Sequence, residues 1–239
     1  MTAGIYYSSV KPVMKAVTTT CYIDQPVQNQ MHINSCAAHV CRELAACQGV
    51  DVSVLWAYYV GRIADGNTQL EDTGVPLITL LKAVQKEGVV PEEQWPFNTN
   101  QVRLQPPPDV TPLRNQIAFD AIRPQQLNNM LSRNRPVGVV VEMSDAFDKF
   151  IGEPDRYHYV YTGTPHDQYA DWGHAMVLTG FVHNVGGPQG SYMARSSWGR
   201  SWGQCGTVYL PYSFVHDPTR CEQFCVARKP HHILGSQLI

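Results

Sequence analysis

One stretch decides the fold of this chain: residues 27–47, with the sequence VQNQMHINSCAAHVCRELAAC. Ser35 is a residue type that caps helices, and the apolar residues that follow have helical spacing up to Gly49, where helices commonly stop. The sequence therefore predicts a helix whose first residue is Cys36. A cysteine at that position lies beside unpaired backbone N–H groups and the positive end of the helix dipole, which favour the thiolate that a nucleophile needs. An inert, buried cysteine is the alternative, so the assignment depends on residues elsewhere.

Two later stretches supply partners for a nucleophilic cysteine. Residues 172–181, WGHAMVLTGF, place His174 at the start of an apolar, β-like run, and residues 194–206, ARSSWGRSWGQCG, form a turn rich in glycine and tryptophan. Together with the first stretch they resemble the papain-like cysteine peptidases. That family has a Gln six residues before the Cys, a Gly-His-Ala strand, and an Asn-Ser-Trp-Gly turn followed by a further Trp-Gly and Gly.

A fourth match lies outside the catalytic positions. Residues 89–97, VVPEEQWPF, follow Gly88 and resemble the Gly-Val-x-Pro-Glu and Trp-Pro-Tyr segment of the bacterial-type members of the family. The resemblance thus extends over roughly residues 20–228. It implies a papain-like fold of the bacterial or viral branch.

The resemblance implies a role for each matching residue. Cys36 would be the nucleophile, His174 its proton partner, and Gln30 a side-chain N–H donor to the oxyanion beside the backbone N–H of Cys36. Trp198 would screen the histidine from water and line the leaving-group side of the cleft, and the backbone of Gly74 would pair with an extended substrate. Taken singly, the last four are equally compatible with a core histidine, a loop glutamine, a core tryptophan and a turn glycine.

Three positions depart from the family pattern. Ser196 stands where the family has the Asn that orients the histidine, Ala37 replaces an aromatic residue, and Ile33 replaces a cysteine. A serine side chain has two heavy atoms fewer than an asparagine side chain and its oxygen lies one bond closer to the backbone, so it would reach the imidazole less easily and could need a bridging water. We still expect Ser196 to be the orienting residue.

Composition excludes several classes of partner. The chain has 239 residues, 16% of them charged, a net charge of -2 and no run of more than two basic residues, which argues against nucleic acid and membrane surfaces as partners. Residues 1–20 contain no continuous apolar segment, so we expect no signal peptide, no transmembrane segment, and a cytoplasmic or assembly-associated location. Because 35 residues precede Cys36, we also expect no long inhibitory pro-segment.

The seven cysteines predict neither a metal site nor a disulfide framework. His32, Cys36, His39 and Cys41 are close in sequence, but they lack the paired spacing of zinc knuckles. We therefore expect no metal and no other cofactor. Without a secretion signal, the thiols should be reduced and mostly buried.

The expected fold class is α+β, with two lobes and a cleft between them. Residues 1–110 would form a helical lobe with an extended N-terminal arm and the nucleophile, and residues 111–239 a β-rich, barrel-like lobe with the histidine. Helices are expected at 52–63, 77–86 and 125–133, and strands at 136–143, 174–182, 191–196, 207–211 and 225–228. A long loop is expected at 151–170 and a hairpin connection at 186–190.

The function that this pattern favours is a thiol peptidase that hydrolyses peptide bonds of a peptide or protein through a Cys36 thioester. Two alternatives use the same fold. One is a noncatalytic or weakly active component that binds a protein partner or belongs to an assembly, as the loss of the orienting Asn suggests. The other is an enzyme that passes the acyl group to an amine instead of water.

Overall fold

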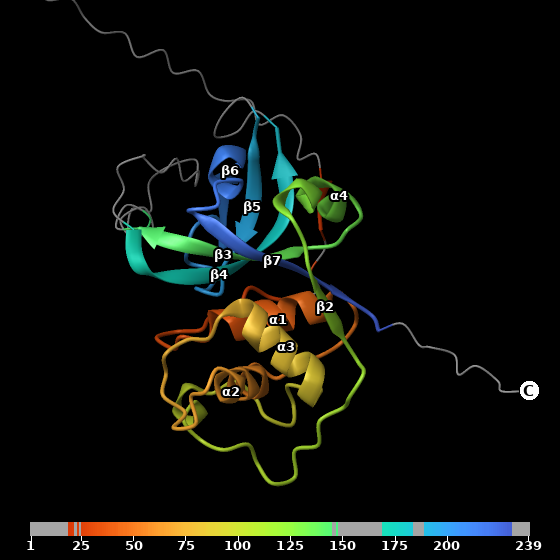
Figure 1. Ribbon diagram of the computed structural model, residues 1–239, viewed down its shortest axis with the longest axis vertical. Helices are drawn as coiled ribbons and strands as arrows, with labels where there is room; N and C mark the ends of the chain where they lie inside the picture. The colour runs from red at the N-terminus through yellow and green to blue at the C-terminus, as the bar shows by residue number, and fades with distance from the viewer. Residues whose placement is uncertain are drawn as a thin grey trace, which may run out of the picture.

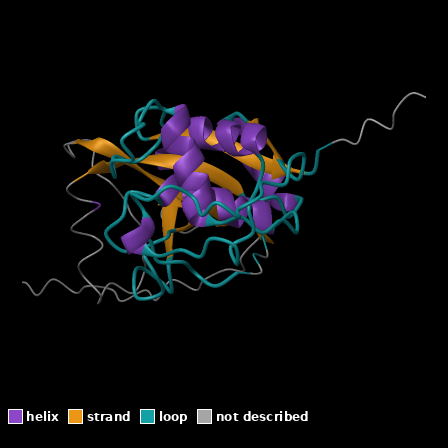
Figure 2. Ribbon diagram, turned by 90° about the horizontal axis from the view of Figure 1, so that it is seen from below, coloured by secondary structure: helices purple, strands orange, loops and turns teal. Residues whose placement is uncertain are grey.

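The computed structural model describes residues 19–21, 23, 25–144, 147, 169–183 and 189–230. A helical half packs against one face of an antiparallel sheet (Figure 1), and Figure 2 shows the helices in front of the strands when the molecule is seen from the helical end. The helices are α1 (Cys36–Ala46), α2 (Val54–Ala64), α3 (Leu77–Glu87), α4 (Leu127–Ser132) and α6 (Tyr212–Val215), with 3-10 turns η1 (Thr99–Gln101) and η2 (Pro124–Gln126). The strands are β1 (Thr19–Thr20), β2 (Ala118–Ala121), β3 (Val137–Ser144), β4 (Tyr169–Val182), β5 (Ser191–Arg195), β6 (Thr207–Pro211) and β7 (Cys221–Arg228). The α+β class and the two-lobed plan are confirmed.

Local signals set the start of α2 and the end of α3. α2 begins two residues later than predicted because Ser53 caps it: its Oγ accepts a hydrogen bond from the backbone N–H of Trp56 at 3.1 Å. α3 ends before Gly88, where φ is +100° and a Cβ would lie 2.8 Å from the carbonyl oxygen of Leu113, so only glycine fits there. No helix within the described ranges is long and apolar enough to cross a membrane.

The sheet is open, so the predicted barrel-like closure is wrong. Its strand order is β2-β7-β3-β4-β5-β6, every pair is antiparallel, and β1 joins at β4. β2 and β6 are the two ends of this path. β2 also contacts α3 of the helical lobe, so this edge of the sheet lies against the helices.

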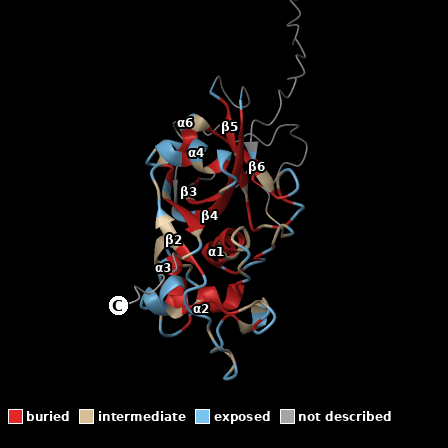
Figure 3. Ribbon diagram, turned by 90° about the vertical axis from the view of Figure 1, so that its right-hand side faces the viewer, coloured by how far each residue is buried: buried red, intermediate tan, exposed pale blue. Residues whose placement is uncertain are grey.

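Strand β4 divides the interior into two cores. Ala175 and Val177 belong to the core of the helical half, whereas Met176 and Leu178 belong to the core on the other side of the sheet. Successive side chains of a strand point to opposite faces, so a continuous apolar run is what a strand with two buried faces requires. Figure 3 shows α1 buried between α2 and the sheet.

Two elements and parts of two strands were not predicted. The short β2 and α6 were missed, β7 begins four residues before the predicted strand, and β4 begins at Tyr169, within the predicted long loop. The rest of that loop, the connection at 184–188 and residues 1–18 of the predicted arm lie outside the described residues.

A buried arginine on α2 joins the loop that precedes α3 to the residue that follows η1. Arg62 on α2 is 1% exposed, and its guanidinium donates to the carbonyl oxygens of Leu70 and Val102 at 2.7 and 2.5 Å. It also lies 4.1 Å from the centre of the Tyr58 ring. Arg62 lies four residues after Tyr58 and seven after Leu55, so the helical spacing places it on the buried face of α2, but that spacing does not indicate its partners.

We expect Arg62→Ala to lower the free energy of unfolding by about 3 kcal/mol, because two buried carbonyl groups would lose their donor and a cavity would remain. Chemical denaturation measures this loss. Arg103→Ala is the matched control, since the Arg103 side chain is 67% exposed; its effect should stay within about 0.5 kcal/mol. Equal losses for the two variants would contradict the role assigned to Arg62.

Candidate active site

The first turn of α1 presents uncapped N–H groups around Cys36. Ser35 occupies the N-cap position, but its side chain forms no capping hydrogen bond; its backbone carbonyl accepts from Ala38 and His39 at 3.0 and 3.1 Å. The predicted start of the helix at Cys36 is confirmed, and the predicted side-chain cap is wrong. As a result, the N–H groups of Cys36 and Ala37 are left for the cysteine sulfur.

Burial and hydrogen bonding act on the Cys36 thiol in opposite directions. Burial raises the pKa of the thiol. Hydrogen bonds from the backbone of Ala175, Ala37 and Cys36 itself lower that pKa by a smaller amount. The helix start therefore favours the thiolate as the sequence predicted, but burial is the larger effect. The sulfur rests as a thiol until a base removes its proton.

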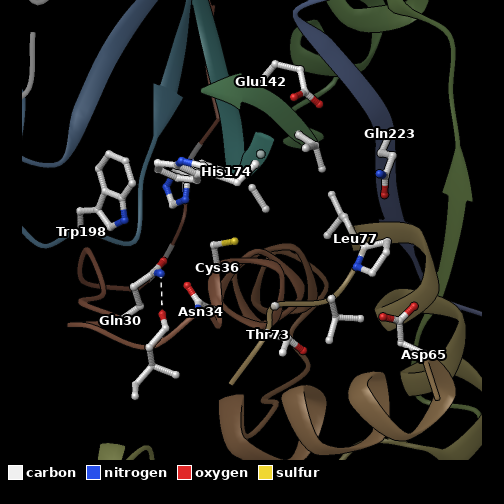
Figure 4. A pocket seen from close by; sticks show the side chains of 18 of the residues that line it. Gln30, Asn34, Cys36, Asp65, Thr73, Leu77, Glu142, His174, Trp198 and Gln223 are labelled. Carbon is white, nitrogen blue, oxygen red and sulfur yellow. Dashed lines mark hydrogen bonds between the residues drawn. The ribbon is translucent and has the colours of Figure 1, made fainter. Parts of the chain in front are cut away.

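His174 lies across the groove from Cys36, on β4, and its surroundings hold the ring in place (Figure 4). Its Nε2 lies 3.0 Å from the Oγ of Ser196, and the Trp198 ring stacks on the imidazole with 4.0 Å between centroids and 20° between planes. Burial, followed by the charge of His39, lowers the pKa of His174 to about 3. The imidazole is therefore neutral at neutral pH and can accept a proton.

The Ser196 hydroxyl reaches the ring directly. The shorter side chain does not need a bridging water, because the chain beyond β5 brings Ser196 close: its backbone N–H donates to the carbonyl of Gly206 at 2.9 Å. Ser196 is 1% exposed. Because Nε2 of His174 faces Ser196, Nδ1 is the ring nitrogen that is left to exchange a proton with Cys36.

Gln30 is held by hydrogen bonds at both ends of its amide. Its Nε2 donates to the carbonyl of Ile33 at 2.6 Å, and its Oε1 accepts from the hydroxyl of Ser197 at 2.6 Å. The second hydrogen of the Nε2 amide is not used by these contacts. Gln30 lines the same groove as Cys36, so its amide nitrogen belongs to the wall beside the sulfur.

A short antiparallel bridge joins the two lobes next to these residues. The N–H of Gln30 donates to the carbonyl of Ser197 at 2.7 Å, and the N–H of Gly199 donates to the carbonyl of Gln28 at 2.9 Å. Asn29 and Trp198 pair between them. The bridge therefore sets Gln30, which precedes the nucleophile, against the turn that carries Ser196 and Trp198.

The groove has a volume of about 690 Å³ and is lined by five of the six residues singled out from the sequence: Gln30, Cys36, Gly74, His174 and Trp198. Ser196 lies behind His174. The N–H of Gly74 already donates to the hydroxyl of Tyr58 at 3.2 Å, and that hydroxyl donates to Asp72 at 2.6 Å. A substrate backbone that pairs with Gly74 would therefore use its carbonyl, or would displace Tyr58.

The cysteines and histidines near α1 form no metal site. Within the part of the chain that the structure describes, no group of three or more His, Cys, Asp or Glu side chains could hold an ion. All seven cysteines are free thiols.

One buried ion pair beside the site was missed by sequence reasoning. Glu43 on α1 is 3% exposed and pairs with Arg195 of β5 at 3.1 Å, and Arg195 also donates to the carbonyl of Gln25 at 2.7 Å. Burial raises the pKa of Glu43 to about 7, and Arg195 opposes that rise. The pair joins the nucleophile helix to the residue before Ser196. The one sign of this ion pair in the sequence was a glutamate among the small residues of α1.

A thiol at a helix start, a neutral imidazole across a groove and an amide donor beside them make up a cysteine-protease type of site. The comparison with protein families agrees: the chain matches the papain family of cysteine proteases over residues 17–222. The chain belongs to that family.

The chain is also similar to individual relatives and solved structures. It is 23% identical over 192 residues to an uncharacterized peptidase C1-like protein of Acanthamoeba polyphaga mimivirus, a match that covers 74% of this chain and 58% of that relative's length. Its fold is similar to xylellain, a cysteine protease from Xylella fastidiosa, with a TM-score of 0.70, 19% identity and coverage of 93% and 90% of the two chains. Procathepsin L2 from the larval midgut of Tenebrio molitor follows, with a TM-score of 0.61, 20% identity and coverage of 85% and 64%.

Proposed function

We propose that this protein is a thiol peptidase that hydrolyses peptide bonds through a thioester on Cys36. The observation that carries the proposal is the pairing of His174 with Ser196 at 3.0 Å under Trp198, opposite a cysteine at a helix N-terminus. Such an arrangement fixes the orientation of the imidazole, because Trp198 covers one face of the ring and Ser196 holds its Nε2. Membership of the papain family supports the same reaction class.

The geometry supports the following sequence of steps. His174 takes the proton of the Cys36 thiol at Nδ1 as the sulfur bonds to the substrate carbonyl carbon. The backbone N–H of Cys36 and the free hydrogen of the Gln30 amide stabilise the oxyanion. The carbon–nitrogen bond then breaks, and the leaving amine takes the proton from His174. Water, deprotonated by the same imidazole, hydrolyses the thioester and restores the thiol.

Selective alkylation tests whether Cys36 is activated. We expect iodoacetamide near neutral pH to modify Cys36 first, with the rate lowered strongly in His174→Ala and the label absent in Cys36→Ala, as mass spectrometry of peptides would show. Equally slow reaction of all the thiols would contradict a catalytic site. It would favour a papain-fold protein that binds a partner or belongs to an assembly.

Replacing Ser196 tests how the histidine is oriented. A hydroxyl both donates and accepts, so Ser196 permits the tautomer with a proton on Nδ1, which cannot accept one from sulfur. An asparagine oxygen only accepts, so it selects the productive tautomer. We expect Ser196→Asn to raise kcat/KM by a few-fold, up to about tenfold, and Ser196→Ala to lower it by roughly tenfold.

The measurement is steady-state hydrolysis of a fluorogenic peptide, with thermal melting to confirm that each variant is folded. An unchanged or lower rate in a folded Ser196→Asn protein would contradict the role of Ser196 as the orienting residue.

The proposal extends to the class of substrate and to the location of the protein. A groove of about 690 Å³ suits an extended peptide or protein segment. We also propose a cytoplasmic or assembly-associated location. With 16% charged residues and a net charge of -2, we propose no nucleic acid or membrane partners. Transfer of the acyl group to an amine is a second outcome of the thioester chemistry, which product analysis with an added amine distinguishes from hydrolysis.

A further inference from the structure

The groove continues past Cys36 on the side away from Trp198. In Figure 4, Gln30 and Trp198 lie on one side of the sulfur, and Glu142, Gln223 and Asp65 lie on the other. In the proposed function Trp198 marks the leaving-group side. The opposite end would therefore receive residues on the acyl side of the cleaved bond.

Apolar residues line the groove from both lobes. Pro76 and Leu77 do so from the helical lobe, and Val140 and Ala175 do so from the sheet. Leu77 lies on the side of the sulfur away from Trp198 (Figure 4). Gly173 keeps the space open, because a Cβ there would lie 2.8 Å from the Cγ1 of Val140 and 3.8 Å from a carboxylate oxygen of Glu142. A side chain with several methylene groups would bury them well between such walls.

The charged residues that line the groove are all acidic: Asp65, Glu142 and Glu222. Glu222 lies opposite Val140 in the β3–β7 ladder, and Glu142 follows two residues later on β3, so both carboxylates are on the face toward the groove. Burial and the nearby charge of Glu222 raise the pKa of Glu142. Within the described ranges no lysine or arginine pairs with either glutamate.

Glu222 is held in place from the other lobe. The Nε2 of Gln223 donates to the Oε1 of Glu222 at 2.6 Å, and the Oε1 of Gln223 accepts from the backbone N–H of Ile78 on α3 at 3.1 Å. Gln223 has φ +55°, and the register of β3 and β7 shifts at this point. The irregularity in β7 thus places the carboxylate of Glu222 at the edge of the groove, where Gln223 holds its orientation.

We propose that this end of the groove binds a lysine or arginine side chain of the substrate, on the acyl side of the cleaved bond. The methylene groups would pack on Leu77 and Val140, and the cationic head would meet Glu142 and Glu222. The inference rests on the proposed peptidase function, and it adds a preference for basic substrates that the family resemblance alone does not supply.

The test uses tetrapeptidyl aminomethylcoumarins, in which the cleaved bond is fixed, with lysine or norleucine at each of the four positions in turn. Norleucine keeps the chain length of lysine without the charge. We expect lysine to raise kcat/KM about tenfold over norleucine at one position, with the ratio falling as salt is added. Glu222→Gln and Glu142→Gln should each reduce the ratio to about threefold, and Glu93→Gln, at an exposed position outside the groove, should leave it unchanged.

Binding of the same peptides to Cys36→Ala, followed by fluorescence anisotropy, separates this inference from the proposed function. If norleucine peptides are cleaved and bound as well as lysine peptides, the basic subsite is wrong while the peptidase function stands. If wild-type protein cleaves none of the peptides, the peptidase function fails, and the ratio of lysine to norleucine affinities in Cys36→Ala still decides the subsite.

Discussion

Cys36→Ala is expected to abolish hydrolysis of a fluorogenic peptide, with kcat lowered at least about a thousandfold, and His174→Ala is expected to do the same. The two residues act as one unit, because the sulfur needs the imidazole to remove its proton: burial raises the pKa of the Cys36 thiol and lowers that of His174. The double variant should therefore be no slower than either single variant. Residual activity in all three would come from oxyanion stabilisation and substrate binding alone.

Cys47→Ala is the control for this experiment. Cys47 follows α1 and is partly buried like Cys36, but it does not line the groove. Its replacement should leave kcat within about twofold. If the losses in the Cys36 and His174 variants multiplied in the double variant, the two residues would act in separate steps, and the shared proton transfer would be contradicted.

Helix ends could be predicted because their causes are local. Gly88 ends α3 through its own backbone conformation, and the spacing of apolar residues places α1, α2 and α3 within two residues of their bounds. The cap of α2 is also local: Ser53 bonds to a residue three positions on. Such signals are carried by residues near each other in the chain.

The sheet could be predicted only in part, because its remaining strands depend on distant partners. β2 has the sequence AFDA, which has no strand pattern of its own, and it pairs with β7 more than a hundred residues later. The irregular start of β7 at Gln223 is set by a contact with Ile78 on α3. Whether the sheet closes depends on where its end strands pack, which alternation along the chain does not show.

The residues of the candidate site could be predicted from spaced motifs, whereas the buried contacts that hold these residues in place could not. The motifs indicated Gln30, Cys36 and His174, which the structure places around one groove. The ion pair of Glu43 with Arg195 joins residues over 150 positions apart. A glutamate among the small residues of α1 is a sign that something must pair with it, but the partner is set by tertiary packing and cannot be identified from the sequence around either residue.

The second large effect concerns His39, which we expect to make the folded protein unstable in acid. His39 lies on α1 and is 2% exposed; its Nδ1 bonds to Oε1 of Gln28, its ring meets Phe97 edge-on at 5.0 Å, and its Nε2 is buried with no partner among the described residues. Burial, and then the charge of Arg42, lowers its pKa from 6.5 to about 3. A protonated His39 would place an unpaired N–H and a charge in the core.

The direction of the pH effect follows from this lowered pKa. Above pH 6.5 the imidazole is neutral in both the folded and the unfolded chain, so its contribution to stability is fully present. As the pH falls from 6.5 toward 3, the unfolded chain binds a proton at His39 that the folded protein does not bind. The free energy of unfolding therefore falls by about 1.4 kcal/mol per pH unit. Between pH 7 and 4.5 the loss from His39 should be about 2–3 kcal/mol.

Urea denaturation at several pH values measures this loss against two His39 variants. His39→Leu and His39→Gln should both be less stable than wild type at pH 7, and the difference should shrink as the pH falls to 4.5, because neither variant titrates there. Burial, the larger cause of the lowered pKa of His174, is present in all three proteins and cancels in the comparison, so only the smaller effect of the His39 charge on His174 differs between them. His32→Gln, at an exposed position, should follow the wild-type curve. A constant difference between wild type and both His39 variants over this range would show that folding leaves the pKa of His39 unchanged, contrary to its burial.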